Sequence, residues 1–536
     1  MNKTQEKFNK KEEKSTFRRI LPQIFASTAM NFLFVGFGMG VAIPTIVIPA
    51  LTGLKNRDEN EFLRFTDVQA SWFASVSYIS QPFGSLLSAV ILEYLGHRKS
   101  MILVDILHII GWLMLYFASS VVELFIAVVI LGIGVGFIEA PILTYVGEIT
   151  EPSIRGVMTS AALFSAGSGF TFLLFLGTQT TWRTASLICC SVPIVTAISC
   201  LFIPDSPYWL LSKNREKDAF KSLQWLRGAA NEEIVIQEFS EMKFYNENAN
   251  KCIPCQKKRV TICSHTESFR EKAKEMLRKR TLKPFLLVLS FFTFYQLSGM
   301  HAMRSYLVQL FETFDSPIDS NWASVIFGIM ATSANIVCTI SVKFIGKRRL
   351  SLISMAFASL SCFALALYAF MVIPHEWSSF DKHMKGPSEQ LEDGLTYIPF
   401  VLFLILSFAT NVGIVPIPWM LISEVFPIKT RGLAGGLIVA FYTFISCITT
   451  KTYLDLERAL AVWGTILFYG VIGAIGFVFI FLFIPETEKC TLEDIERHFS
   501  DNKRKLTDIK IQKNIKVDTN QNAMSEVHDN KAFEKN

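Results

Sequence analysis

The stretch Glu424-Val425-Phe426-Pro427-Ile428-Lys429-Thr430-Arg431-Gly432 reveals how this chain is organised, because the same pattern stands 276 residues earlier. There it reads Glu148-Ile149-Thr150-Glu151-Pro152-Ser153-Ile154-Arg155-Gly156. Each copy combines an acid, a proline and an Arg-Gly pair, and each follows a long apolar run. A motif that recurs at matched places in two halves of a chain indicates an internal repeat.

Two further pairs of motifs extend the repeat. Gly96-His97-Arg98-Lys99 follows the second apolar run, and Gly346-Lys347-Arg348-Arg349 follows the eighth. Pro204-Asp205-Ser206 closes the sixth run, and Pro485-Glu486-Thr487 closes the twelfth. Halves with matched motifs at one membrane face are typical of transporters that are built from repeats.

The composition places the repeat in a membrane. Of 536 residues, 51% are hydrophobic and 18% are charged, whereas soluble chains carry about 25% charged residues. The basic residues lie between apolar blocks, which excludes a nucleic-acid-binding, fibrous or disordered chain. A helix needs about 20 apolar residues to cross a bilayer. Nine runs contain no Asp, Glu, Lys or Arg, and three more carry one acid each, at Asp105, Glu139 and Glu376; the runs are 21–50, 68–92, 101–118, 124–147, 156–182, 184–204, 284–303, 321–342, 350–380, 394–423, 432–450 and 459–485.

These runs predict an all-α membrane protein of twelve transmembrane helices in two pseudo-symmetric halves of six. Lys and Arg number 42 on the side of the N-terminus and 8 on the other side, or 25 against 8 without the long central loop. The positive-inside rule therefore predicts that both termini are cytoplasmic. The first run is too long and starts too late for a signal peptide, so we expect a multi-pass protein of the cell membrane. The expected segments are a cytoplasmic tail (1–20), a first half (21–204), a cytoplasmic loop with short helices (205–283), a second half (284–484) and a cytoplasmic tail (485–536), disordered after about residue 500.

Over about residues 20–500 the chain resembles the sugar porters of the major facilitator superfamily. The resemblance rests on Pro204–Leu210 after the sixth span, on Pro418–Pro427 with Arg431-Gly432 at the tenth, and on Pro485–Thr487 with Thr491–Glu496 at the C-terminal end. Thr450–Leu456 is most similar to the insect facilitated trehalose transporter branch. The resemblance implies the major facilitator fold and a sugar as the substrate.

The resemblance also implies a gate of charged residues at the inner face. Solvated ion pairs suit a gate, because each contributes only about 0–1 kcal/mol. Lys343 stands where the family has an acid, so we expect it to repel Arg431 and to pair with Glu424. A second interpretation is that these are ordinary helix-end charges that obey the positive-inside rule. The candidate gate residues are Glu93, Arg98, Glu148, Arg155, Lys343, Arg348, Glu424 and Arg431.

The sugar site is expected midway across the bilayer, where amides, hydroxyls and an aromatic platform suit a sugar. In the seventh span Gln296 is kept from the family's Q-Q-L-S-G-x-N segment, whereas Tyr295 and His301 replace its first Gln and its Asn. Leu163 replaces the fifth-span glutamine of the glucose carriers. The alternative for each position is helix packing. The candidate substrate-binding residues are Gln296, Trp419, Asn411, His301, Tyr295, Tyr306, Glu139 and Arg304.

Ionisable residues inside spans are functional candidates. Glu139 of the fourth span and Arg304 of the seventh face each other in this fold, so an ion pair between the halves is one expectation, and separate contacts with water or backbone are the other. Asp105 and His108 lie one turn apart and predict a local pair.

The first span contains no titratable group, and Gly38 stands where proton-driven relatives carry an Asp. This favours facilitated diffusion, with proton-coupled symport through Glu139 as an alternative. A non-transporting nutrient sensor is a further alternative, although the polar tail does not favour it. The two-half repeat argues against an ion channel, and the spans hold no clustered catalytic groups of an enzyme.

The central loop contains the residue types of a zinc site, but the second pair is atypically spaced and basic residues intervene, which favours chance. These residues are Cys252, Cys255, Cys263 and His265. We therefore expect no metal and no cofactor. The expected partners are a small-molecule sugar and the lipid bilayer, without nucleic acid, and the expected state is a monomer.

Overall fold

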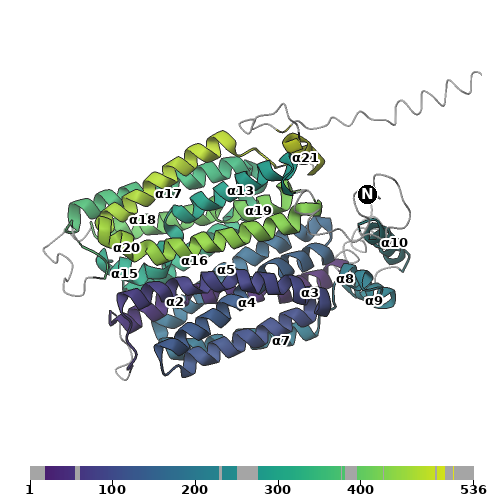
Figure 1. The fold of residues 1–536 in the computed structure, drawn as a ribbon, viewed down its shortest axis with the longest axis horizontal. Coiled ribbons are helices and arrows are strands. Elements are labelled where there is room, and N and C mark those ends of the chain that lie inside the picture. Colours follow the sequence, from purple (N-terminus) through teal and green to yellow (C-terminus); the bar gives the residue numbers. More distant parts are fainter. Residues whose placement is uncertain are drawn as a thin grey trace, which may run out of the picture.

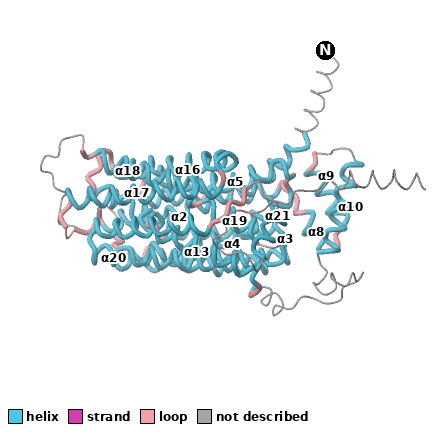
Figure 2. The backbone as a smooth tube through the Cα atoms, turned by 90° about the horizontal axis from the view of Figure 1, so that it is seen from above, coloured by secondary structure: helices cyan, strands magenta, loops and turns pink. Residues whose placement is uncertain are grey.

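The computed structural model describes residues 18–54, 61–228, 232–249, 276–375, 377–380, 395–426, 428–488, 492–500 and 511. These residues contain helices and no strand (Figure 2). The helices of the N-terminal half gather in one bundle, and those of the C-terminal half lie alongside it in a second bundle (Figure 1). The candidate zinc residues Cys252, Cys255, Cys263 and His265 lie outside the described residues.

Twelve membrane-length rods can be traced in the described part of the chain. Nine helices are long and apolar enough to cross a membrane, and a bent pair makes a tenth span. Helix α3 (Asp67–Phe117) breaks at Gly96, which adds the rod formed by residues 67–95. Helix α20 (Ile428–Phe483) breaks at Ala461 and supplies two rods instead of one. The expected all-α fold of two six-helix halves is confirmed.

The remaining rods follow the order of the predicted spans. In the first half they are Arg18–Thr52, which contains α2 (Leu33–Thr52), then α4 (Val121–Ile149), α5 (Pro152–Gln179), and α6 (Trp182–Cys189) with α7 (Ser191–Leu201). In the second half, the seventh rod consists of α13 (Lys279–Leu297), α14 (Met300–Met303), η1 (Arg304–Tyr306) and α15 (Leu307–Thr313). The next two rods are α16 (Ser320–Ile345) and α17 (Lys347–Val372). The tenth rod consists of α18 (Tyr397–Ala409), η2 (Thr410–Ile414) and α19 (Pro416–Val425).

Both repeated motifs lie at the same end of the molecule, which we call the motif end. The short helices α8 (Pro207–Ser212), α9 (Glu216–Leu226) and α10 (Glu232–Ala249) extend from this end beside the N-terminal bundle, and α21 (Leu492–Ser500) packs on α13 and α19 (Figure 1). The other end carries the tight turn between α5 and α6, and we call it the opposite end.

A break in the seventh span positions its polar residues. Gly299 has φ +86°, and a Cβ there would lie 2.2 Å from the ring of Tyr469. Only glycine meets both conditions without strain. The span bends by 47° at this point. After this bend, residues Met300 to Tyr306 run in a new direction toward the opposite end. As a result, His301 and Arg304 lie between the two halves.

The halves meet from the middle of the bundle to the opposite end. There α5 packs on α16, α3 packs on α20, and α2 packs on η1 and α15. The Thr171 and Thr332 hydroxyls share a hydrogen bond of 3.1 Å at this interface. Toward the opposite end, the Arg458 guanidinium forms an ion pair of 2.5 Å with Asp67. These contacts close the opposite end.

Candidate functional site

A group of aromatic rings lies between the halves at the level of the seventh-span break. The Tyr78 ring of α3 lies 4.9 Å from the His301 ring of α14. Tyr295 of α13 stacks on Tyr442 of α20 with ring centroids 6.1 Å apart, and Trp419 of α19 lies 5.4 Å from Tyr442. We call these five residues the aromatic cluster. Their rings offer flat faces of the kind that pack against the C–H face of a sugar.

The amide of Gln296 is anchored at the edge of this cluster. The side chain is fully buried, and its nitrogen donates to the Ser446 hydroxyl and, at 3.5 Å, to the Tyr442 carbonyl. Its Oε1 makes no hydrogen bond within the described protein. A buried amide oxygen without a partner is costly unless another group donates to it. Gln296 therefore presents one fixed acceptor.

His301 and Arg304 form the polar side of the same site. Arg304 Nη2 lies 3.5 Å from the Tyr78 hydroxyl and 3.4 Å from His301 Nδ1. The guanidinium also stands 5.4 Å from the ring centroid of Phe170 on α5, in cation–π geometry. His301 Nε2 and Arg304 Nε are buried without a hydrogen-bond partner in the described protein. Residues of both halves thus surround one guanidinium.

The expected ion pair between Glu139 and Arg304 is not formed. Arg304 contacts neutral rings instead, and Glu139 is 8% exposed with its Oε2 unpartnered in the described protein. Among the described helices, α4 packs mainly on α3 and makes smaller contacts with α2 and α5, whereas η1 packs on α2, α14 and α15. Glu139 and Arg304 are therefore two separate charged groups and not an ion pair.

The expected pair of Asp105 and His108 is also absent. Asp105 Oδ1 accepts a hydrogen bond of 2.6 Å from the Thr196 hydroxyl of α7. The His108 ring instead lies against Gly134 of α4, where a Cβ would come within 2.7 Å of it. Although Asp105 and His108 lie one turn apart on α3, each side chain contacts a neighbouring helix instead of the other.

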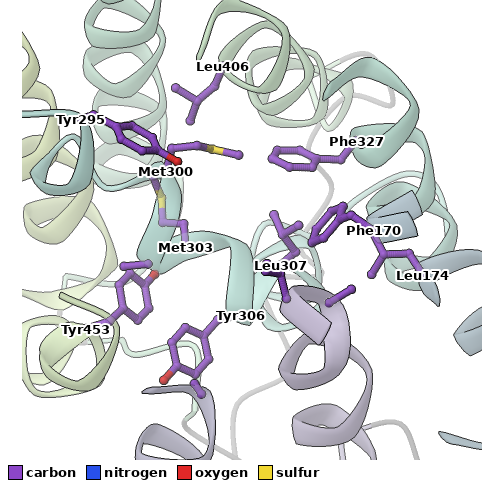
Figure 3. Close-up of a cluster of buried hydrophobic side chains, with 14 of the residues drawn as sticks. Phe170, Leu174, Tyr295, Met300, Met303, Tyr306, Leu307, Phe327, Leu406 and Tyr453 are labelled. Atoms are coloured by element: carbon purple, nitrogen blue, oxygen red, sulfur yellow. The ribbon is translucent and has the colours of Figure 1, made fainter. Parts of the chain in front are cut away.

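The other candidate site residues differ in their surroundings. Asn411 lies on the π-helical turn η2, and its amide donates to the Ser407 carbonyl at 2.9 Å. Tyr306 is buried beside Tyr453 (Figure 3), with ring centroids 5.0 Å apart, and its hydroxyl donates to the Thr450 carbonyl at 3.4 Å. These contacts give Tyr306 a packing role. Tyr78 and Tyr442, in contrast, belong to the aromatic cluster although no sequence motif singled them out.

At the motif end, a buried lysine organises the C-terminal half. Lys347 is 4% exposed, and its Nζ lies 2.8 Å from Glu424 and 2.6 Å from Glu488. The Thr487 hydroxyl also donates to Glu424 at 2.8 Å. The expected pairing of Glu424 with Lys343 is therefore wrong, because Lys343 is exposed and Lys347 takes that place.

The carboxylate of Glu486 accepts the first backbone N–H groups of α17, from Lys347 at 3.1 Å and from Arg348 at 3.2 Å. An acid at a helix N-terminus satisfies otherwise free N–H groups. The Arg348 guanidinium donates to the Phe481 carbonyl at 2.7 Å. This gate candidate therefore links α17 to α20 within its own half.

The N-terminal half repeats this scaffold with other charges. The Ser206 hydroxyl donates to Glu148, and Asp205 accepts from the Arg98 backbone N–H at 3.0 Å. Burial raises the pKa of the Asp205 carboxyl, against the opposing hydrogen bond and charge of Arg98. Glu93 is exposed. The side chains of Arg155 and Arg431 lie outside the described part of the structure.

A bundle of two repeated six-helix halves, with a polar and aromatic site between them, defines a membrane transporter of the major facilitator superfamily. Within that class, the chain belongs to the family described as "Sugar (and other) transporter", whose profile matches residues 6–499.

Individual relatives agree with this family. The chain is 27% identical over 490 residues to a facilitated trehalose transporter Tret1 of Apis mellifera ligustica, which covers 91% of this chain and 90% of the relative. The same name is carried by a relative from Polypedilum vanderplanki, 27% identical over 496 residues, with 91% and 90% covered.

Among solved structures, the fold is similar to a partially occluded inward open conformation of the xylose transporter XylE from E. coli. The TM-score is 0.66 at 16% identity, and 87% of this chain and 98% of that chain are covered. A structure described as the proton:xylose symporter XylE with a bound bromo-deoxyglucose also scores 0.66, at 18% identity, and covers 89% of this chain and 98% of that chain. At these identities the likeness concerns the fold.

Proposed function

We propose that this chain carries a sugar, either trehalose or a hexose, across the cell membrane by facilitated diffusion through alternating access. The observation that carries the proposal is the central site, in which aromatic faces lie beside Gln296 Oε1 and His301 Nε2, both buried and unpartnered in the described protein. Sugar hydroxyls donate and accept hydrogen bonds, and sugar C–H faces pack on aromatic rings. The names of the trehalose transporter relatives support the same substrate class.

We assign the motif end to the cytoplasm, because this side carries 25 Lys and Arg against 8 even without the central loop. With this assignment, the contacts between the halves at the opposite end lie at the outer face. Both halves of the site come from one chain, so we take the monomer as the working unit.

The packing of the first span favours facilitated diffusion. A Cβ at Gly38 would lie 1.8 Å from the Ala166 carbonyl oxygen of α5. Backbone contact this close leaves no room for a carboxylate at the position where proton-driven relatives carry one. Proton-coupled symport is the second candidate, and the buried Glu139 with its unpartnered Oε2 is the observation that favours it.

The test is radiotracer uptake into expressing cells with trehalose, glucose and polyols at two external pH values. Facilitated diffusion predicts saturable, bidirectional uptake that is independent of pH and stops at equal concentrations. Accumulation that a protonophore abolishes, and that Glu139→Gln also abolishes, would establish the symporter instead. Gln296→Ala and Trp419→Ala should lower uptake at unchanged surface expression, and normal uptake in both variants would remove these residues from the site.

A further inference from the structure

Arg304 is a cation in the middle of the site, and its partners are neutral. Its contacts are the Tyr78 hydroxyl, His301 Nδ1 and the Phe170 ring. No carboxylate forms an ion pair with it anywhere in the described residues. Arginine is protonated under all physiological conditions. A positive charge therefore stands between the halves without an anion.

The backbone holds this charge in place. Gly299 turns the chain before Arg304, and the Thr45 hydroxyl of α2 donates to the Arg304 carbonyl at 2.9 Å. Tyr78 and Phe170 come from the N-terminal half, and His301 comes from the C-terminal half. The guanidinium is thus presented at the interface where a transported solute contacts both halves.

The chemistry of a guanidinium selects its ligand. Its planar donors match a carboxylate, which accepts two parallel hydrogen bonds. A cation held away from water without an anion is costly, and an anionic ligand removes that cost. A neutral sugar engages the same donors with hydroxyls only, and hydrogen bonds to a charged group are stronger when the partner is charged as well.

We propose that the site prefers a sugar-sized solute that carries a carboxylate, a sugar acid, with the carboxylate on Arg304 and the hydroxyls on Gln296 and His301. This inference rests on the proposed sugar transport and narrows its substrate class. Glu139 of α4 is buried as well, but among the described residues it forms no ion pair with Arg304, so it does not take the place of the proposed carboxylate.

The experiment uses the full chain purified into liposomes, with counterflow of labelled glucuronate and labelled glucose. Arg304→Gln should lower the ratio of glucuronate to glucose uptake about tenfold or more, since a hydrogen bond to a charged group contributes about 1.5–3 kcal/mol. Arg304→Lys should retain part of the preference. Arg458→Gln, which removes one positive charge at the opposite end, is the matched control and should leave the ratio unchanged. An unchanged ratio in folded Arg304→Gln would overturn the inference.

A measurement on the unmodified protein covers the case in which Arg304→Gln does not fold. Glucuronate should inhibit glucose counterflow at about tenfold lower concentration than glucuronamide, its neutral amide. Equal inhibition by the two would overturn the sugar-acid preference and leave neutral sugar transport standing. Counterflow of glucuronate without that of glucose or trehalose would support Arg304 as the selector and refute the neutral substrate. If none of the three solutes moves, both proposals fail.

Discussion

At the motif end, the N-terminal half buries a histidine where the C-terminal half buries a lysine. His97 and Lys347 are matched members of the repeated basic motifs and are 3% and 4% exposed. Lys347 bridges Glu424 and Glu488, whereas His97 lies 3.5 Å from the Thr144 hydroxyl. One repeat position therefore serves as an ionic centre in one half and as a packed ring in the other.

The rest of the scaffold is shared. Ser206 and Thr487 donate to the motif glutamates Glu148 and Glu424. Asp205 and Glu486 accept backbone N–H groups at the start of the third and ninth rods, from Arg98 and Lys347. The two halves therefore share the geometry of these hydrogen bonds and differ in charge, and we expect the ion pairs of Lys347 to make the motif end of the C-terminal half the more stable of the two.

Removing the buried lysine tests this difference most directly. Lys347→Met leaves Glu424 and Glu488 side by side without their cation, and breaking a buried ion pair in this way costs about 3–5 kcal/mol. We expect the largest drop in the melting temperature of the detergent-purified protein for this variant. His97→Met is the matched control and should cost much less, because the described structure shows no ion pair for His97. Equal drops in both variants would refute the asymmetry.

Because the two halves share this scaffold, substitution of the matched glycines should lower the stability of the protein equally. Gly96 and Gly346 have φ +78° and +89° before the third and ninth rods. A Cβ would lie 2.9 Å from the Trp209 ring at Gly96 and 2.5 Å from the Glu486 carboxylate at Gly346. Gly96→Ala and Gly346→Ala should each lower stability by about 1–3 kcal/mol, from the backbone conformation alone. Thermal unfolding measures both, and tolerance of either substitution would show that the two turns are not equivalent.

Moving the positive charge to the N-terminal half tests whether that half can hold an ion pair at the same repeat position. His97→Lys places a cation at the repeat position where the C-terminal half has one, and Glu148 is the repeat counterpart of its partner Glu424. We expect a gain of about 1 kcal/mol, at the upper end for a partly solvated pair, seen as a higher melting temperature. His97→Gln keeps a polar group without the charge and should show no gain. A lower melting temperature for His97→Lys alone would mean that the N-terminal module cannot accept an ion pair.

The smallest effect is expected at the opposite end, where the ion pair of Asp67 and Arg458 joins the two halves on the surface. Such pairs contribute about 0–1 kcal/mol, so Asp67→Asn should barely change the melting temperature. It should nevertheless favour opening, by up to about fivefold. Cys447 is buried on α20, which packs on α3 of the other half, and reports on this opening.

Labelling of Cys447 by an external, membrane-impermeant maleimide should therefore rise in Asp67→Asn, and Cys447→Ser identifies the labelled site. Arg458→Gln should raise labelling equally, and the double variant should add little, because both changes break one interaction. Additive increases would show that the two residues do not act as a pair.

The sequence singled out part of the residues that lie together between the halves. Gln296, His301 and Trp419 were named because the seventh and tenth spans carry recognisable motifs, and the structure brings them together with Tyr295, while their role in binding stays a prediction. Tyr78 and Tyr442 escaped prediction, since tyrosines in apolar spans carry no local pattern. The pairing of Lys343 with Glu424 was wrong, and of the two expectations for Glu139 and Arg304 the ion pair is not formed, because charge complementarity identifies candidates without specifying which helices pack together.

The membrane class, the two-half repeat and the twelve spans follow from the amino-acid sequence alone, because apolar length and motif spacing are local properties that burial in lipid enforces. Which polar side chains bind one another depended on the tertiary structure. Glu61, from a connection of no recognisable pattern, binds Trp182 and Arg183 at the turn between α5 and α6. Lys347 rather than Lys343 reaches Glu424, and Arg304 stands among neutral rings. Each of these contacts joins residues far apart in the chain, and only the packing of the helices brings their side chains within hydrogen-bond distance.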